Sequence, residues 1–279
     1  MRGIIPSVCV LAACNSAPAN ERDANPTGDS APAADGSGTT NTPTLPPLNG
    51  KLDYQLGGAY TPPAGVQIIS RDRNAPAAAG LYNICYVNGF QIQPDEAAMW
   101  MAQHSDLILR DGQGAPVIDT VWNEMLIDTS TSTKRAAVLA VEAPWLTGCK
   151  QAGFDAVEID NLDSYARSQN LLTQDDNVAM LGAIASFVHG EGLALAQKNA
   201  TELVPRKAEL GADFVVSEEC DRYAECDLYR NGYGDHVLVI EYRRQDFTTG
   251  CTSYPQLSIV LRDLNLVTPT NSGYVYDGC

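Results

Sequence analysis

The sequence predicts an α/β protein whose strands and helices form a (β/α)8 TIM barrel with an excursion after the third strand. Three observations predict it. Short apolar segments alternate with segments of helical spacing, as in parallel sheets. Eight apolar segments follow residue 50 of the 279-residue chain, which suits one barrel. Polar residues follow these segments, where barrel enzymes carry their chemistry. An open doubly wound sheet is the alternative, but no glycine-rich phosphate loop supports it.

The eight expected strands are apolar runs bounded by polar residues, glycine or proline. They cover residues 52–56, 66–71, 81–87, 156–160, 193–198, 213–218, 236–241 and 258–262. Helix-like spacing lies between them, at 95–104, 135–149, 175–191 and 201–210. Thr173 followed by Asp176 resembles a helix start, and Gly190 with Gly192 suits the end of that helix.

Residues 105–132 do not fit a simple strand–helix unit. We interpret them as the excursion, with one or two short extra strands lying over the barrel mouth. Trp100 and Trp122 lie near this segment, and an aromatic side chain at a barrel rim can stack on a sugar. A tryptophan more often packs against its neighbours, so we expect packing for both.

The N-terminus resembles a bacterial lipoprotein signal. Arg2 supplies a basic start, residues 4–13 form an apolar run, and Leu11-Ala12-Ala13-Cys14 resembles the lipobox. This pattern predicts a signal peptide over residues 1–13 and lipidation of Cys14, with an ordinary signal peptide or an unprocessed start as alternatives. Asn15 follows Cys14, which favours the outer membrane if the cell has two membranes. We therefore expect a domain that is lipid-anchored in the bacterial cell envelope, outside the cytoplasm.

Composition separates a linker from the domain. Residues 14–50 are rich in Ala, Pro, Asn, Ser, Thr, Gly and Asp, which predicts a disordered linker before a domain over 51–279. The formal net charge of −16 disfavours nucleic acid and anionic lipid as partners and is compatible with a cationic substrate. No later apolar run is long enough to span a bilayer. The sequence predicts no cofactor, and we expect a monomer.

The cysteines predict disulfides. Of the eight, Cys9 lies in the predicted signal peptide and Cys14 is the lipidation site; an even number then remains in an exported domain. Cys220 is expected to pair with Cys226 because the two are close in sequence. Cys251 is expected to pair with Cys279 and to tether the C-terminus, and elimination leaves Cys85 with Cys149. Zinc is the alternative, but the spacing lacks Cys-x-x-Cys pairs and the histidines are scattered, so no metal is predicted.

Residues 153–165 place a polar cluster directly after an apolar strand. Side chains alternate along a strand, so Glu158 and Asp160 face the same side. Two carboxylates on one face of a buried strand resist desolvation, which packing alone seldom explains. We interpret the pair as part of a site at a strand end; a harmless pair on a surface edge strand is the alternative. Glu158, one layer deeper, is expected to raise the pKa of Asp160 by repulsion.

Acids, amides and a lysine recur where the expected strands end. These positions are Asp72, Asn88, Asp160, Asn161, Lys198, Asn199, Glu218, Glu219, Glu241 and Tyr242. Glycoside hydrolysis requires one protonated and one ionised carboxyl group flanking the scissile bond. Asp160 and Glu218 end separate strands and can face each other across a cleft, so we expect them to be the catalytic pair. Lys198 is expected to keep a neighbouring acid ionised or to form a plain structural salt bridge.

Several motifs occur together and in order over about residues 52–245. They are Tyr54-Gln55-Leu56, Cys85-Tyr86-Val87-Asn88-Gly89, residues 122–128, residues 153–161 with Asp163 and Tyr165, Gln197-Lys198-Asn199, Ser217-Glu218-Glu219-Cys220, Glu225-Cys226-Asp227 and Glu241-Tyr242. As a set they resemble glycoside hydrolase family 114, the endo-α-1,4-polygalactosaminidase-like barrels. The sequence departs from that pattern at Met125, where a tryptophan is usual, at Glu219, where glutamine is common, and in the less acidic segment 68–73.

The resemblance implies a glycosidase that acts within an α-1,4-linked galactosamine-containing polysaccharide. We expect substrate contacts from residues around the catalytic pair. These are Tyr54, Tyr86, Glu158, Asn161, Asp163, Lys198, Asn199, Glu241 and Tyr242. An acidic cleft would attract a polymer with free ammonium groups. The alternatives are a surface polysaccharide-binding protein on a barrel that no longer catalyses, and an interaction scaffold whose acids are solvated rim charges.

Overall fold

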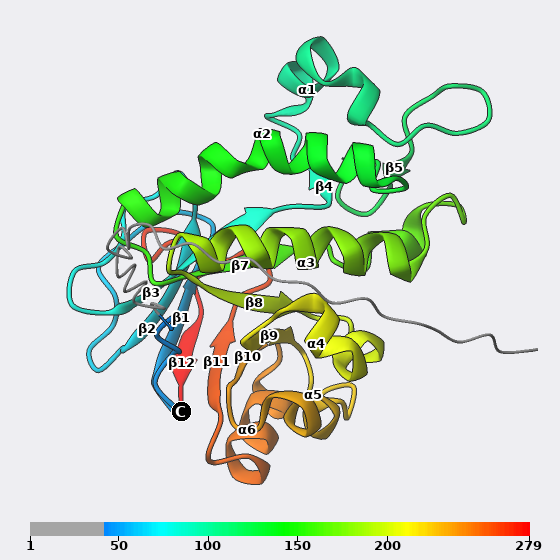
Figure 1. The fold of residues 1–279 in the computed structure, drawn as a ribbon. Coiled ribbons are helices and arrows are strands. Elements are labelled where there is room, and N and C mark those ends of the chain that lie inside the picture. Colours follow the sequence, from blue (N-terminus) through cyan, green and yellow to red (C-terminus); the bar gives the residue numbers. More distant parts are fainter. Residues whose placement is uncertain (1–41) are drawn as a thin grey trace, which may run out of the picture. The chain divides into compact units, whose positions relative to one another are not determined.

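The computed structural model describes residues 42–279, and Figure 1 shows how their elements are arranged. The predicted signal peptide at 1–13, the lipidation site Cys14 and the linker as far as residue 41 lie outside the described residues. The remaining residues of that predicted linker lie against the barrel. The hydroxyl group of Tyr82 donates to the backbone oxygen of Thr44 at 2.7 Å, and Leu45 packs against the barrel interior. Between residues 42 and 279, none of the helices has the length and apolar character that crossing a membrane requires.

Parallel strands form the barrel wall, and every predicted strand is present. They are β1 (Leu52–Gln55), β2 (Ile68–Asp72), β3 (Tyr82–Asn88), β7 (Ala156–Asp160), β8 (Ala194–Lys198), β9 (Phe214–Glu218), β10 (Val237–Glu241) and β11 (Ser258–Arg262). Consecutive strands in this order pair in parallel, as the barrel requires. The observed ends differ from the expected ones by only a residue or two, as is usual for strand ends.

A side chain completes the wall between the first and last barrel strands. The hydrogen-bonded order of the described residues runs from β1 to β11 and then to β12 (Tyr276–Gly278), which is antiparallel to β11. Arg262, fully buried at the end of β11, donates to the backbone oxygen of Tyr54 and, at 3.1 Å, to a carboxylate oxygen of Asp53. The parallel sheet is therefore nearly closed, and an arginine bridges β11 to β1.

Side chains alternate between the barrel interior and the surrounding helix layer. On β7, Ala156 belongs to the interior cluster, whereas Val157 and Ile159 belong to the cluster under the helices. Apolar residues on both faces explain why this strand reads as a nearly continuous apolar run. The same alternation points Glu158 and Asp160 inward, as the sequence predicted.

Helices cover the outside of the wall. They are α2 (Ser132–Gln151), α3 (Gln174–Gly190), α4 (Lys207–Leu210), α5 (Cys226–Tyr233) and α6 (Arg244–Ser253), whereas α1 (Ala97–Gln103) lies beyond α2 in Figure 1. The predicted capping box is present, because Thr173 and Asp176 bond each other's backbone N–H groups at the start of α3. Residues 201–210 are helical as expected, but Thr201–Arg206 is a 3₁₀ helix that contains Pro205. Proline lacks the N–H that an α-helix interior needs, which favours the irregular turn.

The excursion after β3 forms a small antiparallel sheet. It consists of β4 (Gln91–Ile92), β5 (Ile118–Asp119) and β6 (Glu124–Leu126), in the order β4-β6-β5. The turn between β5 and β6 contains Asn123, whose φ of 58° lies in the left-handed region that asparagine tolerates. The sequence predicted extra strands here, and the structure places them as a hairpin whose end reaches the barrel mouth.

The disulfides pair as predicted. Cys85 of β3 is bonded to Cys149 of α2, Cys220 to Cys226, and Cys251 of α6 to the C-terminal Cys279. The first bridge ties a barrel strand to its covering helix, and the last ties the C-terminus beside β11. Disulfides persist in oxidising compartments, so the bridges indicate a domain that folds outside the cytoplasm.

Candidate active site

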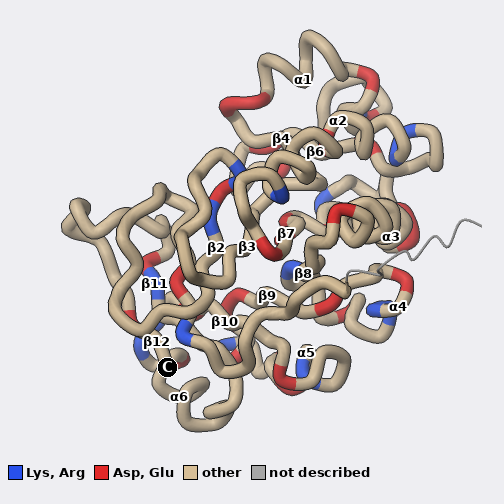
Figure 2. The backbone as a smooth tube through the Cα atoms, turned by 60° about the vertical axis from the view of Figure 1, so that its left-hand side comes forward, with Lys and Arg blue, Asp and Glu red and all other residues tan. Residues whose placement is uncertain are grey.

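The C-terminal ends of the barrel strands surround a cavity of about 560 Å³. Its lining combines strand ends, the loop after β1, the excursion hairpin and the loop after β11. The lining residues are Tyr54, Leu56, Gly57, Tyr86, Gln93, Asp119, Val121, Trp122, Glu124, Asp160, Asn161, Asp163, Arg167, Lys198, Asn199, Glu218, Tyr242, Leu264, Asn265 and Leu266. Figure 2 shows acidic and basic segments gathered along β7, β8 and β9. The cavity therefore lies at the end of the barrel where the sequence placed the chemistry.

Three consecutive barrel strands turn sharply as they reach this cavity. Asn161, Asn199 and Glu219 directly follow β7, β8 and β9, and their φ angles are 64°, 49° and 58°. Asparagine tolerates this left-handed conformation, whereas glutamate adopts it at a cost of about 1–3 kcal/mol. The turns leave the last side chains of the strands, Asp160 and Glu218 among them, lining the cavity.

Glu158 and Asp160 share the inner face of β7 but occupy different depths. Asp160 lines the cavity, whereas Glu158 is fully buried beneath it. The hydroxyl groups of Tyr54 and Ser70 donate to the two oxygens of Glu158, at 2.6 and 3.0 Å. A buried carboxylate with these donors is held in one position. The expectation that Glu158 contacts substrate is therefore wrong, because its side chain does not reach the cavity surface.

Lys198 stands between three carboxylates. Its ammonium nitrogen lies 3.2 Å from Glu158, 3.5 Å from Asp160 and 3.3 Å from Glu218. Burial alone would lower the pKa of Lys198, but Asp160, Glu218 and Glu158 together raise it well above its usual value. Because one ammonium contacts both Asp160 and Glu218, the nearest oxygens of those two acids lie within about 7 Å of each other.

Asp160 is stabilised as a carboxylate. Burial would raise the pKa of Asp160, but Lys198, the hydroxyl group of Tyr86 at 2.7 Å and the backbone N–H of Asn161 at 2.8 Å lower it below its usual value. The net shift of Asp160 is therefore opposite to the one expected from repulsion by Glu158. Lys198, which was expected from the sequence to keep a neighbouring acid ionised or to form a salt bridge, contacts both carboxylates and outweighs their repulsion.

Glu218 faces Asp160 from β9 in a more open setting. Its side chain is 30% exposed and that of Asp160 is 20% exposed. The hydroxyl group of Tyr242 donates to one oxygen of Glu218, and the amide of Asn199 donates to the other at 3.0 Å. The same Asn199 side chain accepts from the backbone N–H of Glu218 at 2.8 Å, so Asn199 holds both the backbone and the carboxylate of Glu218. The arrangement brings together the two acids that the sequence singled out.

Glu241 lies outside the cavity. Leu238 and Ile240 face the barrel interior, so Glu241 faces outward, where it is fully buried and accepts from the backbone N–H of Asp221 at 2.9 Å. Its other oxygen has no hydrogen-bond partner, and burial raises the pKa of Glu241 to about 7. The expectation that Glu241 contacts substrate is therefore wrong. The next residue, Tyr242, has the opposite orientation and lines the cavity.

The remaining predicted contacts all line the cavity. They are Tyr54, Tyr86, Asn161, Asp163, Lys198, Asn199 and Tyr242. The amide of Asn161 donates to Asn88 at 3.0 Å, and Asp163 accepts two hydrogen bonds from Arg167, at 2.7 and 2.8 Å. These contacts fix the rim that follows β7.

Sequence reasoning missed several lining residues. Asp119 and Glu124 come from the excursion hairpin, and Arg167 from the loop after β7. Trp100 is fully buried as expected, but Trp122 is 61% exposed, so the expectation that it packs was wrong. The signal in the sequence was the polar pair Asn123 and Glu124 directly before Met125, which is weak evidence for a hairpin turned toward a cleft.

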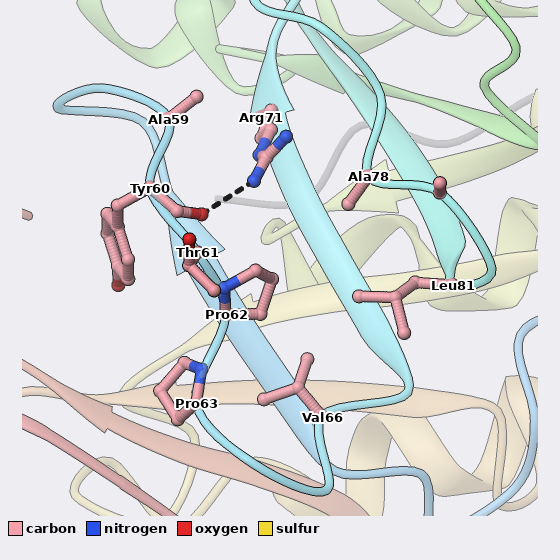
Figure 3. A pocket seen from close by; sticks show the side chains of 10 residues that line it. Ala59, Tyr60, Thr61, Pro62, Pro63, Val66, Arg71, Ala78 and Leu81 are labelled. Atoms are coloured by element: carbon pink, nitrogen blue, oxygen red, sulfur yellow. Dashed lines mark hydrogen bonds between the residues drawn. The ribbon is translucent and has the colours of Figure 1, made fainter.

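A second hollow, of about 510 Å³, lies beside β2 and is drawn in Figure 3. Arg71 lies at its back, but the guanidinium group donates to the oxygens of Gln55, Pro76 and Tyr60, at 3.0, 2.6 and 2.8 Å. Its lining contains alanine, proline and other apolar residues and no carboxylate. Without an acid pair, this hollow cannot carry the chemistry that the larger cavity supports.

Comparison with known proteins bears on both fold and site. The sequence profile of glycoside-hydrolase family GH114 matches residues 32–279. The structure is similar to Ega3 from Aspergillus fumigatus, crystallised in complex with galactosamine, with a TM-score of 0.66 and 22% identity over 87% of this chain and 100% of that one. No curated protein sequence matches.

Two structures of the glycoside hydrolase domain of PelA from Pseudomonas aeruginosa are also similar, with TM-scores of 0.55 and 0.52. Each is 16% identical and covers 81% of this chain and 97% of the PelA domain. Identities this low indicate a shared fold alone. They confirm the predicted barrel.

Proposed function

The chain belongs to glycoside-hydrolase family GH114, and on that premise we propose that it is an exported endo-glycosidase for an α-1,4-linked, galactosamine-containing polysaccharide. The observation that carries the proposal is the facing pair Asp160 and Glu218, held by one lysine at the mouth of the barrel. A glycosidase needs two such carboxyl groups flanking the scissile bond.

We assign the nucleophile to Asp160. Its pKa is lowered chiefly by Lys198 against the effect of burial, so the side chain is ionised at neutral pH and can attack the anomeric carbon. Glu218 then serves as the acid that protonates the departing glycosidic oxygen. In the second step Glu218 takes a proton from water, and the water oxygen displaces Asp160 from the sugar.

This assignment predicts a retaining enzyme. Inverting pairs stand about 6.5–9.5 Å apart to admit a water molecule, whereas retaining pairs stand about 5–5.5 Å apart. The two acids contact one ammonium, which keeps their nearest oxygens within about 7 Å, shorter than most of the inverting range. NMR of the first product formed tests this: α-configured reducing ends support retention, and β-configured ends would indicate inversion.

An amino-sugar substrate is supported by charge. The cavity is lined by Asp119, Glu124, Asp160, Asp163 and Glu218, against the two cations Lys198 and Arg167. The excess of carboxylates attracts a polymer that carries ammonium groups. Ega3, a structural relative, was crystallised with galactosamine, which supports the same class of sugar.

For localisation, we propose that Cys14 carries a lipid anchor that holds the domain at the cell envelope, in the outer membrane if the cell has two. The lipobox-like residues Leu11 to Cys14 support this proposal. Mass spectrometry of the N-terminal peptide tests it. A diacylglyceryl mass on Cys14 supports the anchor, and an unmodified or differently cleaved N-terminus would contradict it.

The activity is tested by incubating the protein with purified α-1,4-linked galactosamine polymer. Mass spectrometry should detect oligosaccharides of several lengths early in the reaction, as endo cleavage requires. Binding of the polymer without any new reducing ends would favour a binding protein on the same barrel. Release of monosaccharide alone would contradict endo action.

A further inference from the structure

We propose that Glu124 and Trp122, at the end of the excursion hairpin, form a sugar subsite that distinguishes a free amino sugar from its N-acetylated form. This inference rests on the proposed function and names the residue that binds the ammonium group of the sugar. Both side chains line the cavity, and neither belongs to the barrel strands that carry the catalytic pair.

The argument begins with the partners of the cavity's carboxylates. Asp160 and Glu218 share Lys198. Arg167 bonds Asp119 at 2.9 Å and Asp163 at 2.7 Å. Glu124 forms no salt bridge with any residue between 42 and 279. It is thus the lining acid that no cation of the described residues contacts directly.

The surroundings of Glu124 favour a visiting cation. One oxygen accepts from the amide of Asn88 at 3.0 Å, which orients the carboxylate without neutralising it. Burial, with the charges of Asp160 and Asp119, raises the pKa of Glu124 against the opposing effects of the bond from Asn88 and the charge of Arg167. An ammonium group beside Glu124 would relieve this repulsion, whereas an acetamido group carries no charge and would not.

Trp122 supplies the other half of the subsite. Its side chain is 61% exposed although it borders the cavity, and only Asn123, in a left-handed turn conformation, separates it from Glu124. The apolar face of a pyranose can stack on an exposed indole ring. Stacking does not depend on the substituent at nitrogen, so Trp122 contributes affinity and Glu124 contributes discrimination.

Affinity measurements on the full chain test the two roles separately. Asp160→Asn serves as the background, so that bound oligosaccharides stay intact. Isothermal titration compares a galactosamine hexamer with the same hexamer fully N-acetylated. Adding Glu124→Gln, which can still accept from Asn88, should weaken binding of the free-amine hexamer about tenfold and leave the acetylated one within about twofold.

Trp122→Ala should instead weaken binding of both hexamers alike, by about three- to tenfold. Asp95→Asn is the matched control, because Asp95 is an exposed acid ahead of α1 and its loss changes the net charge by the same amount. It should change neither affinity by more than about twofold. An equal loss for both hexamers in Glu124→Gln, no loss in either, or no binding of the free-amine hexamer by the background protein would overturn the proposal.

Cleavage by the wild-type chain is measured separately, so the two proposals can fail independently. If the wild type cleaves nothing but the affinity pattern holds, the subsite stands and the hydrolase assignment falls. If the wild type cleaves both polymers and Glu124→Gln shows no selective loss, the subsite falls and the hydrolase stands.

Discussion

The ammonium nitrogen of Lys198 lies 3.2 Å from a carboxylate oxygen of Glu158, and neither side chain is more than 2% exposed. The same ammonium donates to the hydroxyl oxygen of Tyr54 at 3.1 Å, and that hydroxyl donates to Glu158. Glu158 thus holds Lys198 in place, and the ammonium group of Lys198 also contacts Asp160 and Glu218. This fixed cation keeps two neighbouring acids from repelling each other.

Replacing Lys198 by methionine should destabilise the fold strongly. The change leaves Glu158 buried without its cation, and removal of one partner of a buried pair costs about 3–5 kcal/mol. Urea denaturation at pH 7 measures the free energy of unfolding. Adding Glu158→Gln should restore part of the loss, because the buried charge is gone, while activity stays low. Lys150→Met, at an exposed lysine, is the control and should change stability by less than about 0.5 kcal/mol. Wild-type stability in Lys198→Met would contradict this account.

Tyr86→Phe should shift the acidic limb of the pH–activity profile. The hydroxyl group of Tyr86 donates to Asp160 at 2.7 Å and helps to lower the pKa of that acid. Without it the pKa rises, so the ionised nucleophile is lost at a higher pH, by about one pH unit. The pH dependence of kcat/KM measures the shift. Tyr233→Phe, which removes a hydroxyl bonded to Gln197 outside the cavity, should leave the limb in place. A limb that moves equally in both variants would show that Tyr86 does not act on Asp160.

Glu241→Gln should stabilise the protein at alkaline pH. The folded-state pKa of about 7 lies above the unfolded value of about 4.3, so the folded protein holds this proton more tightly. Stability contributed by Glu241 is therefore present below pH 4 and is lost as pH rises toward 7. Glutamine avoids the buried charge and still accepts from Asp221. We expect a gain of up to about 3 kcal/mol at pH 8 and a much smaller one at pH 5. An equal effect at both values would exclude titration of Glu241 as the cause.

The disulfides should differ in their contribution to stability. The bridge from Cys85 to Cys149 spans 64 residues and that from Cys220 to Cys226 spans 6. If a bridge acts mainly on the unfolded chain, the longer loop contributes about 4 kcal/mol and the shorter about 2 kcal/mol. In one variant both cysteines of the long bridge are replaced by serine, and in another both cysteines of the short bridge. Thermal and urea unfolding of the two variants measure the difference in stability. A larger loss from the short bridge would mean that it acts through the folded loop after β9 instead.

The strands could be predicted because the barrel leaves a local signal. Each is an apolar run that ends at a polar residue, and alternation alone puts Glu158 and Asp160 on one face. The partners of those acids are not local. Lys198 reaches them from the neighbouring strand, and only the pairing of β7 with β8 brings its charge beside them.

The incorrect predictions also concern residues whose positions depend on contacts between distant parts of the sequence. β10 is buried on both faces, so its sequence gives no alternation that would separate the outward Glu241 from the inward Tyr242. The turn that exposes Trp122 depends on the pairing of β5 with β6, two very short strands with little pattern to read. Residues placed by long-range packing therefore had to come from the structure.

The central claim is that Asp160 and Glu218 together cleave the glycosidic bond. Its most direct test is the rate at which the wild type, Asp160→Asn and Glu218→Gln release reducing ends from α-1,4-linked galactosamine polymer, with circular dichroism confirming that all three are folded. We expect each substitution to lower that rate by at least about a thousandfold, because each removes one half of the required acid pair. A folded variant of either residue that retains the wild-type rate would remove it from the catalytic pair and contradict the account.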